Sequence, residues 1–483
     1  MGPQSDRATQ RLQGPLVLND ATTRHGRRRP DRGASAAGAA GSAGDVPGLA
    51  ARQAAAKLLA AVIDARTPLD GLTDHDHGHP NFRALDMRDR ALARAILATA
   101  LRHRGTISRL IAGRLERPLP PKAHQLSHVL HVAASQILFL DIPDSAAVDL
   151  AVTHAKADPR TARFSGLVNG VLRGIARDKA DVLPAELDRQ DDVPEWFRDR
   201  LAGAYGTVKA QAILAAHRVE APVDFTVKSD PSRWAQAFGG MVLATGSVRV
   251  ERLAAAVADL PGYGDGEWWV QDAAASLPAK LLGDVPGRRV VDLCAAPGGK
   301  TAQLVLAGAE VTALDSSRNR LKRLGENLER LRLRASTLEA DMLKYEPDTL
   351  FDAALLDAPC SSTGTVRRHP DIPWTKAPED IAKLADLQSL LLARAATMVK
   401  PGGRIVFSNC SLDPAEGELL VAAFLAGHPD FALDPVSPGE VAGADSFIAA
   451  NGTIRTTPAD LDLGRPEISG LDGFFAARFL RLR

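Results

Sequence analysis

The stretch Arg289-Val-Val-Asp-Leu-Cys-Ala-Ala-Pro-Gly-Gly-Lys300 decides the fold. Its apolar start is typical of a buried strand, and its glycine turn leads into a helix that begins near Thr301. A strand, a tight turn and a helix form the first unit of a parallel α/β sheet. Two glycines let a ligand approach the backbone where the first N–H groups of the helix point outward. The turn is neither G-x-G-x-x-G nor a phosphate loop, because the first glycine of G-x-x-x-x-G-K-[ST] is missing.

Strands and helices alternate from about residue 251 onward. Leucine-rich helical repeats at 321–331 and 381–392 separate several of the apolar runs. This alternation predicts a doubly wound α/β sheet of the Rossmann-like type. The runs that predict its strands lie at 289–294, 310–315, 335–340, 351–357, 404–408 and 474–480.

An aspartate ends or follows several of these strands. Asp315 ends the second one, 23 residues after Asp292, where an acid would hold ribose hydroxyls. Asp341 follows the third, where the adenine edge of a nucleoside would lie. Any single aspartate of this kind is explained equally well as a helix N-cap. The set favours S-adenosylmethionine over a dinucleotide, because no pyrophosphate has to be seated.

The three cysteines of the chain are Cys294, Cys360 and Cys410, each at or beside the end of a predicted strand. Ligands of an open α/β sheet bind at that edge, so we interpret the thiols as parts of one active site; buried apolar cysteines are the alternative. C5 of a pyrimidine is a poor nucleophile, and a thiolate that adds to C6 activates it. Cys360, Cys410 and Asp357 are therefore candidates to meet over one base.

The catalytic part of the chain resembles the Nol1/Nop2/Sun family of RNA cytosine C5 methyltransferases. The resemblance covers residues 225–483 and implies a class I S-adenosylmethionine-dependent methyltransferase. The motifs that carry it are Asp292 to Lys300, Asp357-Ala-Pro-Cys-Ser-Ser-Thr-Gly-Thr365, Arg367-Arg-His-Pro-Asp-Ile-Pro-Trp374, Asn409-Cys-Ser-Leu-Asp-Pro-Ala-Glu416, Trp269-Val-Gln-Asp272 and Asp472-Gly-Phe-Phe475.

The resemblance implies a role for each matching residue. Cys410 would attack C6, Cys360 would assist release of the methylated product, and Asp357 would lie near the cytosine as well as the cofactor. DNA cytosine methyltransferases place their nucleophile in a Pro-Cys motif instead, so spacing alone does not assign the two thiols. Asn409 stands where the family usually has threonine, and we expect it to preserve the strand end. The residues implied for the S-adenosylmethionine site are Cys294, Ala295, Ala296, Pro297, Gly298, Gly299, Lys300, Asp315, Asp341 and Asp357.

Residues 49–182 show helical periodicity throughout, with apolar stripes such as the one at 126–138. Their plan is similar to the NusB-like RNA-binding domain of the bacterial 16S rRNA branch of the same family. We therefore expect a multidomain protein with an all-α NusB-like part and an α/β catalytic part. The expected divisions are a disordered basic tail at 1–48, the NusB-like helical domain at 49–182, a linker and small α/β module at 183–250, and the Rossmann-like methyltransferase domain at 251–483.

Arg367, Arg368 and His369 follow the Cys360 loop, and we predict that they hold phosphates beside a base flipped out of its stack. An exposed charged loop is the alternative. The helical domain also has an excess of arginine between 88 and 109, which suits either phosphate contacts or an ordinary solvated helix face.

Two polar segments carry weaker signals. Residues 1–48 are rich in Gly, Ala and Arg, so they are expected to be disordered and either touch RNA or form a solvated leader. His75, His77 and His79 alternate as in a metal-binding tract, but no cysteine or nearby acid pair completes a site. We therefore expect a polar loop there and no bound metal.

The composition indicates a cytoplasmic protein. Three cysteines without a disulfide framework fit a reducing compartment. The sequence contains no run of about 18 apolar residues, so we expect no membrane span. The N-terminus lacks the apolar core of a signal peptide. The net charge of +1 means that RNA has to be bound by local basic patches. We expect a monomer whose partner is RNA.

Together these features predict an enzyme that forms 5-methylcytidine in RNA, with 16S rRNA as the expected substrate. The same chemistry on tRNA or 23S rRNA is an alternative. A non-catalytic RNA-binding assembly factor is another, although a retired active site has no need of both cysteines and an intact cofactor turn. A small-molecule methyltransferase would not need the helical domain.

Overall fold

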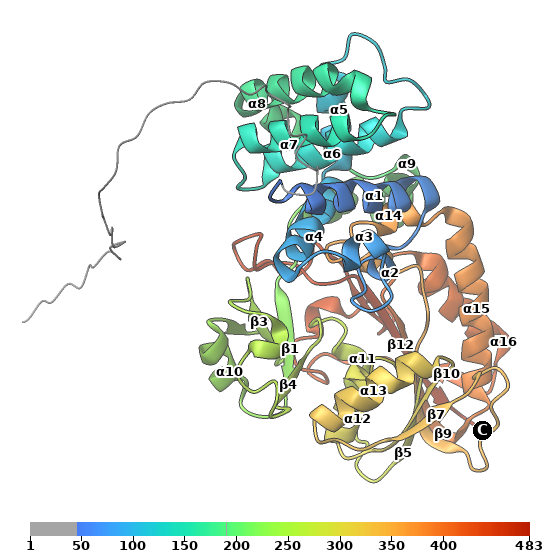
Figure 1. The fold of residues 1–483 in the computed structure, drawn as a ribbon. Helices are drawn as coiled ribbons and strands as arrows, with labels where there is room; N and C mark the ends of the chain where they lie inside the picture. Colours follow the sequence, from blue (N-terminus) through green and yellow to red (C-terminus); the bar gives the residue numbers. More distant parts are fainter. Residues whose placement is uncertain (1–45, 190) are drawn as a thin grey trace, which may run out of the picture. The chain divides into compact units, whose positions relative to one another are not determined.

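The computed structural model describes residues 46–189 and 191–483 (Figure 1). The predicted basic tail at 1–48 lies outside the described residues except for its last three positions. Contacts join residues 46–483 into one unit.

The first part of this unit is helical, as predicted. Helix α6 (His124–Phe139) is its centre, because apolar residues surround it on all sides. One core cluster packs Val129 and Leu130 of α6 against neighbouring helices, and a second cluster packs Val132 on the other side. The remaining elements are α1 (Leu49–Ala65), α2 (Leu69–Leu72), α3 (Pro80–Arg83), α4 (Met87–Arg102), α5 (Arg104–Ala112), α7 (Asp144–Ala157), η1 (Ala162–Phe164), α8 (Ser165–Asp188) and α9 (Glu195–His217).

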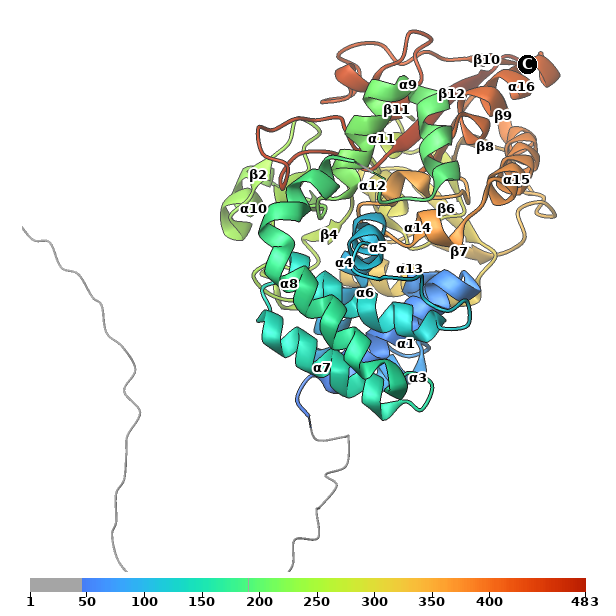
Figure 2. The same ribbon diagram turned by 90° about the horizontal axis from the view of Figure 1, so that it is seen from above.

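The helical structure continues past the predicted boundary at residue 182. Helix α8 continues to Asp188 with Pro184 in its interior. The Asp- and Pro-rich composition of this stretch is typical of a linker, but the structure is helical there. Helix α9 occupies most of the rest of the predicted linker, and it breaks at Gly206, whose φ is 73°. Phe197 and Leu214 of α9 pack in one cluster with residues of the catalytic part. Figure 2 shows where α9 lies in the ribbon. The helix is therefore a packed element and not a linker.

The small α/β module is present but longer than predicted. Its four-stranded sheet has the order β2-β3-β1-β4, with all neighbours antiparallel. Trp268 on β4 packs with Phe225 and Trp234 in the core, so the module extends beyond the predicted end at residue 250. Its elements are β1 (Val223–Val227), α10 (Pro231–Phe238), β2 (Met241–Val242), β3 (Val248–Val250) and β4 (Trp268–Val270).

The large sheet has the order β10-β12-β9-β8-β5-β6-β7, with β11 paired to β12. Strands β7, β6, β5, β8 and β9 run parallel, and β12 joins β9 antiparallel. The chain moves outward from β5 to β7 and then returns to β8 on the other side of β5, so β5 and β8 flank a topological switch point. The strands are β5 (Arg289–Leu293), β6 (Glu310–Asp315), β7 (Ser336–Glu339), β8 (Phe351–Asp357), β9 (Val399–Asn409), β10 (Phe431–Leu433), β11 (Ile454–Thr456) and β12 (Phe474–Arg481).

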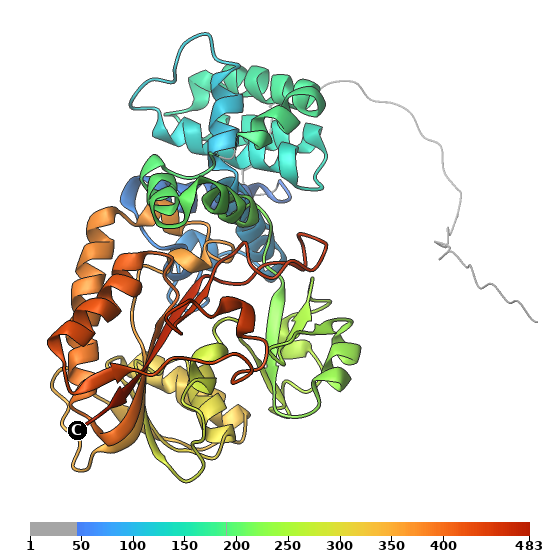
Figure 3. The ribbon, with the colours of Figure 1, turned by 180° about the vertical axis from the view of Figure 1, so that it is seen from behind.

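Helices cover both faces of this sheet (Figure 3). Val291 points into the cluster that contains Leu391 and Phe424, whereas its neighbour Val290 points into the cluster with Leu304 on the opposite face. This alternation is the period of two expected of a strand buried on both sides. The helices are α11 (Leu277–Lys280), α12 (Gly299–Leu306), α13 (Arg318–Arg330), α14 (Ile372–Thr375), α15 (Pro378–Ala396) and α16 (Glu418–Gly427).

Short 3-10 turns complete the connections at η2 (Val257–Asp259), η3 (Thr363–Thr365), η4 (Pro414–Glu416) and η5 (Asp445–Phe447). Within residues 46–189 and 191–483, no helix combines the length and the apolar character that crossing a membrane requires.

Candidate active site

A cavity of about 390 Å³ opens at the carboxyl ends of β5, β6, β8 and β9, beside the switch point. Cys294, Cys360 and Cys410 all line it, so the structure brings the three thiols of the sequence to one place. Asp315, Asp341 and Asp357 line it as well, which places three carboxylates around one space. The other lining residues are Ala296, Leu314, Ser316, Arg320, Ala340, Met342, Leu343, Ala358, Pro359, Ser362, Leu387 and Leu391.

The buried side chain of Asp292 stabilises the turn after β5. This carboxylate is fully buried and accepts a hydrogen bond of 2.6 Å from the Thr301 hydroxyl, while its second oxygen has no partner among the described residues. Burial raises the pKa of Asp292 to about 7. Gly298 has a φ of 101°, and a Cβ there would lie 3.0 Å from Leu324, so only glycine fits without strain.

Asp315 ties the turn to the end of β6. Its carboxylate accepts hydrogen bonds from the backbone N–H groups of Ala296 (3.3 Å) and Ser317 (2.9 Å). The Arg320 guanidinium, which sequence reasoning did not single out, lies 3.2 Å from the same carboxylate and also lines the cavity. Asp341, in contrast, is half exposed at the mouth and pairs with Lys344 at 3.6 Å.

Cys360 and Cys410 face each other with 3.4 Å between their sulfur atoms. Strands β8 and β9 pair in parallel with Asp357 beside Ser408, so the residues just beyond the two strand ends meet. The hydrogen bond from the Cys360 thiol lowers the pKa of Cys410 and raises the pKa of Cys360. Cys410 is then the more readily deprotonated thiol of the pair, with Cys360 as its hydrogen-bond donor.

Cys294 differs from the other two thiols because burial raises its pKa to about 12. It is also one of the few non-glycine residues with a positive φ, at 61°, which is where the chain leaves β5 for the turn. A thiol with so high a pKa stays protonated near neutral pH. We therefore expect Cys294 to line the cavity without acting as a nucleophile.

Asp357 is held in place from two sides. Lys300 of the glycine turn donates to one carboxylate oxygen at 2.7 Å, and the Ser408 hydroxyl donates to the other at 3.0 Å. The Lys300 ammonium also lies 5.0 Å from the centre of the Phe474 ring. Its positive charge favours the Cys410 thiolate as well, after the larger effect of the Cys360 hydrogen bond on that pKa. Lys300 thus connects the glycine turn to Asp357.

The two arginines predicted to hold phosphates are engaged within the protein. Arg367 is 2% exposed, and Arg368 lies between Asp272 (2.7 Å) and Asp472 (3.0 Å), both buried. Phosphate contact by these two side chains therefore does not fit the structure, because buried acids that lie far away in the sequence take up the Arg368 guanidinium. His369 is partly exposed and lies 3.3 Å from Asp70 of the helical part.

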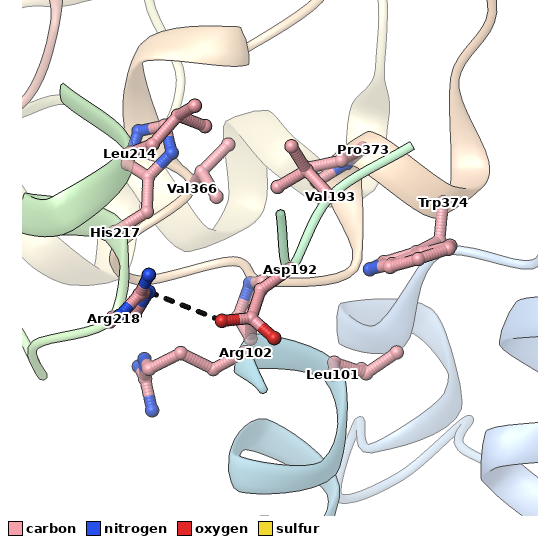
Figure 4. A pocket seen from close by; sticks show the side chains of 11 residues that line it. Leu101, Arg102, Asp192, Val193, Leu214, His217, Arg218, Val366, Pro373 and Trp374 are labelled. Carbon is pink, nitrogen blue, oxygen red and sulfur yellow. Dashed lines mark ion pairs between the residues drawn. The ribbon is translucent and has the colours of Figure 1, made fainter. Parts of the chain in front are cut away.

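Figure 4 shows the contact around this loop, where the helical part, helix α9 and the loop after Cys360 meet. Arg218 pairs there with Asp192 at 3.1 Å. Close by, Arg102 donates to the backbone carbonyl of Arg367 at 2.9 Å. The space left between these residues is about 10 Å³, room for a single water at most, so it is a packing contact and not a ligand site.

The predicted histidine tract is not a metal site in the structure. His75 pairs with its neighbour Asp76 on the surface, and His79 accepts the N–H of Asn81 at the start of α3. In the part of the chain that the structure describes, no group of three or more possible ligands is arranged to hold a metal ion.

Comparison with known proteins decides the family. Residues 279–480 match the family "16S rRNA methyltransferase RsmB/F", and residues 49–177 match the NusB family. The chain is 34% identical over 416 residues to ribosomal RNA small subunit methyltransferase B of Serratia proteamaculans, which covers 83% of this chain and 92% of the relative. The corresponding protein of Vibrio cholerae is 36% identical over 374 residues, with coverage of 73% and 85%.

This chain belongs to the RsmB/F family of rRNA methyltransferases. The crystal structure of PH0851 shares the fold, with a TM-score of 0.67 at 22% identity over 90% of this chain and 99% of that one. The resemblance to the Nol1/Nop2/Sun family and the NusB-like assignment of the helical part are therefore confirmed. The protein is an rRNA methyltransferase, and S-adenosylmethionine is its cofactor.

The cavity has the chemistry that S-adenosylmethionine needs. Asp315 at the end of β6 and Asp341 after β7 supply acceptors for hydroxyl and amino groups, and Leu314 and Met342 supply apolar surface between them. The turn that begins α12 leaves backbone N–H groups for a carboxylate. The residues present thus fit the cofactor, and Asp315 with Cys294 and Ala296 of the turn would be its main support.

Sequence reasoning missed two buried side chains beside the thiols. Glu416 lies inside the quoted motif that begins at Asn409, but no role was assigned to it. Gln388 interrupts the apolar stripe of α15, which is the signal that would have found it, since a buried polar residue on such a stripe needs specific partners.

Proposed function

We propose that this RsmB/F family member methylates C5 of a cytosine in 16S rRNA through a covalent bond between Cys410 and C6. The observation that carries the proposal is the Cys360–Cys410 contact of 3.4 Å inside the cavity that suits the cofactor. The small-subunit substrate is supported by the names of the relatives, which are ribosomal RNA small subunit methyltransferases B.

The Cys410 thiolate would add to C6 of the cytosine, and the electron pair of the C5–C6 double bond would become available at C5. S-adenosylmethionine, when bound, supplies the methyl group to C5. Loss of the C5 proton then returns its electron pair to the C5–C6 bond, and the sulfur of Cys410 leaves as a thiolate. The Cys360 thiol, as the hydrogen-bond donor, stabilises that thiolate both before the attack and after its release.

Asp357 is placed to contact the cytosine ring near N3. Lys300 and Ser408 fix both of its oxygens, so its position is set before the base arrives. A base flipped out of the RNA stack has to enter the cavity, whose lining includes the half-exposed Asp341. Of the three predicted phosphate contacts we keep the partly exposed His369. We exclude Arg367 because it is buried, and Arg368 because Asp272 and Asp472 take up its guanidinium. A ribosomal RNA substrate would place the protein in the cytoplasm.

The test is transfer of labelled methyl from S-adenosylmethionine to protein-free 16S rRNA, with nucleoside analysis of the product. Wild type and Cys410→Ala run side by side, and only wild type is expected to form 5-methylcytidine. Separate reactions with tRNA and 23S rRNA test the alternative substrates. Label in tRNA or 23S rRNA but none in 16S rRNA would refute the substrate, and 5-methylcytidine formed by Cys410→Ala would refute the nucleophile.

A further inference from the structure

Two buried side chains bind the residues on both sides of Cys360. Gln388, on α15, donates from its amide nitrogen to the carbonyl of Pro359 at 3.0 Å. Glu416, at the end of η4, accepts the backbone N–H of Ser361 at 2.9 Å and also accepts the Ser361 hydroxyl. The loop that carries Cys360 is therefore held just before and just after the thiol.

The same two side chains bind the residues on both sides of Cys410. Asn409 donates from its amide nitrogen to the backbone carbonyl of Glu416 at 2.6 Å and to the Gln388 amide oxygen at 3.3 Å. The Ser411 hydroxyl donates to the Glu416 carboxylate at 2.5 Å. Gln388 and Glu416 also join each other at 2.8 Å. Four residues next to the two cysteines thus converge on one pair.

This pair is separate from the reacting groups. Gln388 and Glu416 are fully buried and do not line the cavity, so they touch neither cofactor nor substrate there. In a buried, water-free position the hydrogen bonds to a carboxylate are strong and set a precise geometry. The arrangement also gives Asn409 a function, since its amide reaches both members of the pair.

We infer that Gln388 and Glu416 are positioning residues that hold the two cysteine loops at the separation at which the Cys360 thiol donates a hydrogen bond to Cys410. The inference rests on the proposed function and adds the side chains that set the contact between the thiols. Misplacement of a reacting group by about 1 Å costs about 100-fold in rate. The two loops also meet directly, because the Gly364 N–H donates to the Cys410 carbonyl at 2.9 Å and the Ser361 and Ser411 hydroxyls lie 3.1 Å apart. Gln388 and Glu416 add buried side chains from α15 and η4 to this contact.

The decisive variant is Glu416→Gln, which keeps the volume of the side chain and removes the charge that accepts two hydroxyl groups. We expect kcat for 16S rRNA to fall at least about tenfold, while KM changes by less than about twofold. The second readout is the rate at which iodoacetamide alkylates Cys410, followed by mass spectrometry across pH. Its midpoint should move to higher pH, because loss of the Cys360 hydrogen bond raises the pKa of Cys410.

Glu440→Gln is the matched control. Glu440 pairs with the buried Arg478 in the same domain but outside the cavity, so this variant should keep the wild-type kcat and alkylation profile. If Glu416→Gln does not fold, the double variant Ser361→Ala/Ser411→Ala decides by the same two readouts, because it removes the bound hydroxyls and leaves the carboxylate.

If the pH profile of Cys410 alkylation is the same in Glu416→Gln as in wild type, the inference is overturned whether or not activity falls. Gln388 and Glu416 would then not set the contact between the thiols. A shifted profile with lowered kcat supports the inference. Absence of 5-methylcytidine from the wild-type reaction would refute the proposed function instead. The alkylation profiles need no RNA, so they would still test the pair in that case.

Discussion

At the scale of single residues, different surroundings give the three cysteine side chains of the site different pKa values. Cys360 and Cys410 share one hydrogen bond, which lowers the pKa of the acceptor and raises that of the donor. Cys294 lines the same cavity, but burial raises its pKa to about 12. The proposed nucleophile, its hydrogen-bond partner and a thiol that stays protonated near neutral pH therefore share one cavity.

Removal of the donor should trap the reaction. In Cys360→Ala, Cys410 can still add to C6 but lacks its partner at the release step, so a covalent complex with 16S rRNA should accumulate. Denaturing gel electrophoresis would show it as a slowly migrating band that wild type and Cys294→Ser lack. A band of equal intensity in Cys360→Ala/Cys410→Ala would contradict the assignment of the nucleophile.

Asp292 should make stability depend on pH. Because burial raises its pKa in the folded protein to about 7, the folded state binds the proton more tightly than the unfolded state does. The stabilising contribution is complete below the unfolded pKa of about 4 and is lost as the pH rises through 7. Urea unfolding of wild type and Asp292→Asn at several pH values measures it. The stability of wild type relative to the variant should decrease from pH 4 to pH 7, and an increase would contradict the prediction.

At the scale of elements, the loop between β8 and α15 connects three parts of the molecule. It carries Cys360 at the cavity, Arg368 between two buried acids, and Trp374, which packs against the core of the helical part. Arg368 also donates to the backbone carbonyl of Pro222, just before β1, at 3.0 Å, so the small sheet is fixed to this loop.

Loss of the Arg368 guanidinium should destabilise the protein strongly. Arg368→Ala leaves Asp272 and Asp472 buried without their shared partner, which we expect to cost about 3–5 kcal/mol of unfolding free energy. Arg323→Ala is the control, because it removes an exposed pair with Asp74 and should cost less than about 1 kcal/mol. Chemical denaturation measures both. Equal losses for the two variants would show that the buried cluster is not a structural charge pair.

The strands, the glycine turn and the helical repeats follow from local patterns, so the sequence predicts them. Glycines and proline mark the turn, and apolar runs mark β5, β6 and β8. The burial of Arg368 depends on Asp272 and Asp472, which lie 96 and 104 residues away, and no local pattern reports such a pairing. The boundary predicted at residue 182 ends helix α8 too early for a related reason. Pro184 is typical of a helix end, but the surrounding packing keeps this stretch helical.

At the scale of the whole molecule, the helical and catalytic parts share a contact made of both apolar and polar groups. Trp374 of α14 packs on the helical core, with the Arg104 guanidinium 5.4 Å from the ring centre. The backbone N–H of Leu69 donates to Asp371 at 2.9 Å. Such a contact makes the two parts unfold together as long as it remains intact.

Trp374→Ala should uncouple them. Removal of the indole leaves the helical part with less support, so its unfolding should separate from that of the catalytic part and begin about 5 °C earlier. Differential scanning calorimetry would resolve two transitions in the variant and one in wild type. Leu390→Ala, on an exposed position of α15, should leave a single transition. One unchanged transition in Trp374→Ala would refute the coupling.

The position of β12 has a consequence for synthesis on the ribosome. In sequence it follows β9, β10 and β11, but in space it lies between β9 and β10 and also pairs with β11. A nascent chain that has emerged only through residue 456 therefore exposes one edge of β9, and β10 and β11 have no neighbour in the sheet. Chaperones that bind exposed sheet edges have their target in this interval, until residues 474–481 leave the exit tunnel and close the sheet.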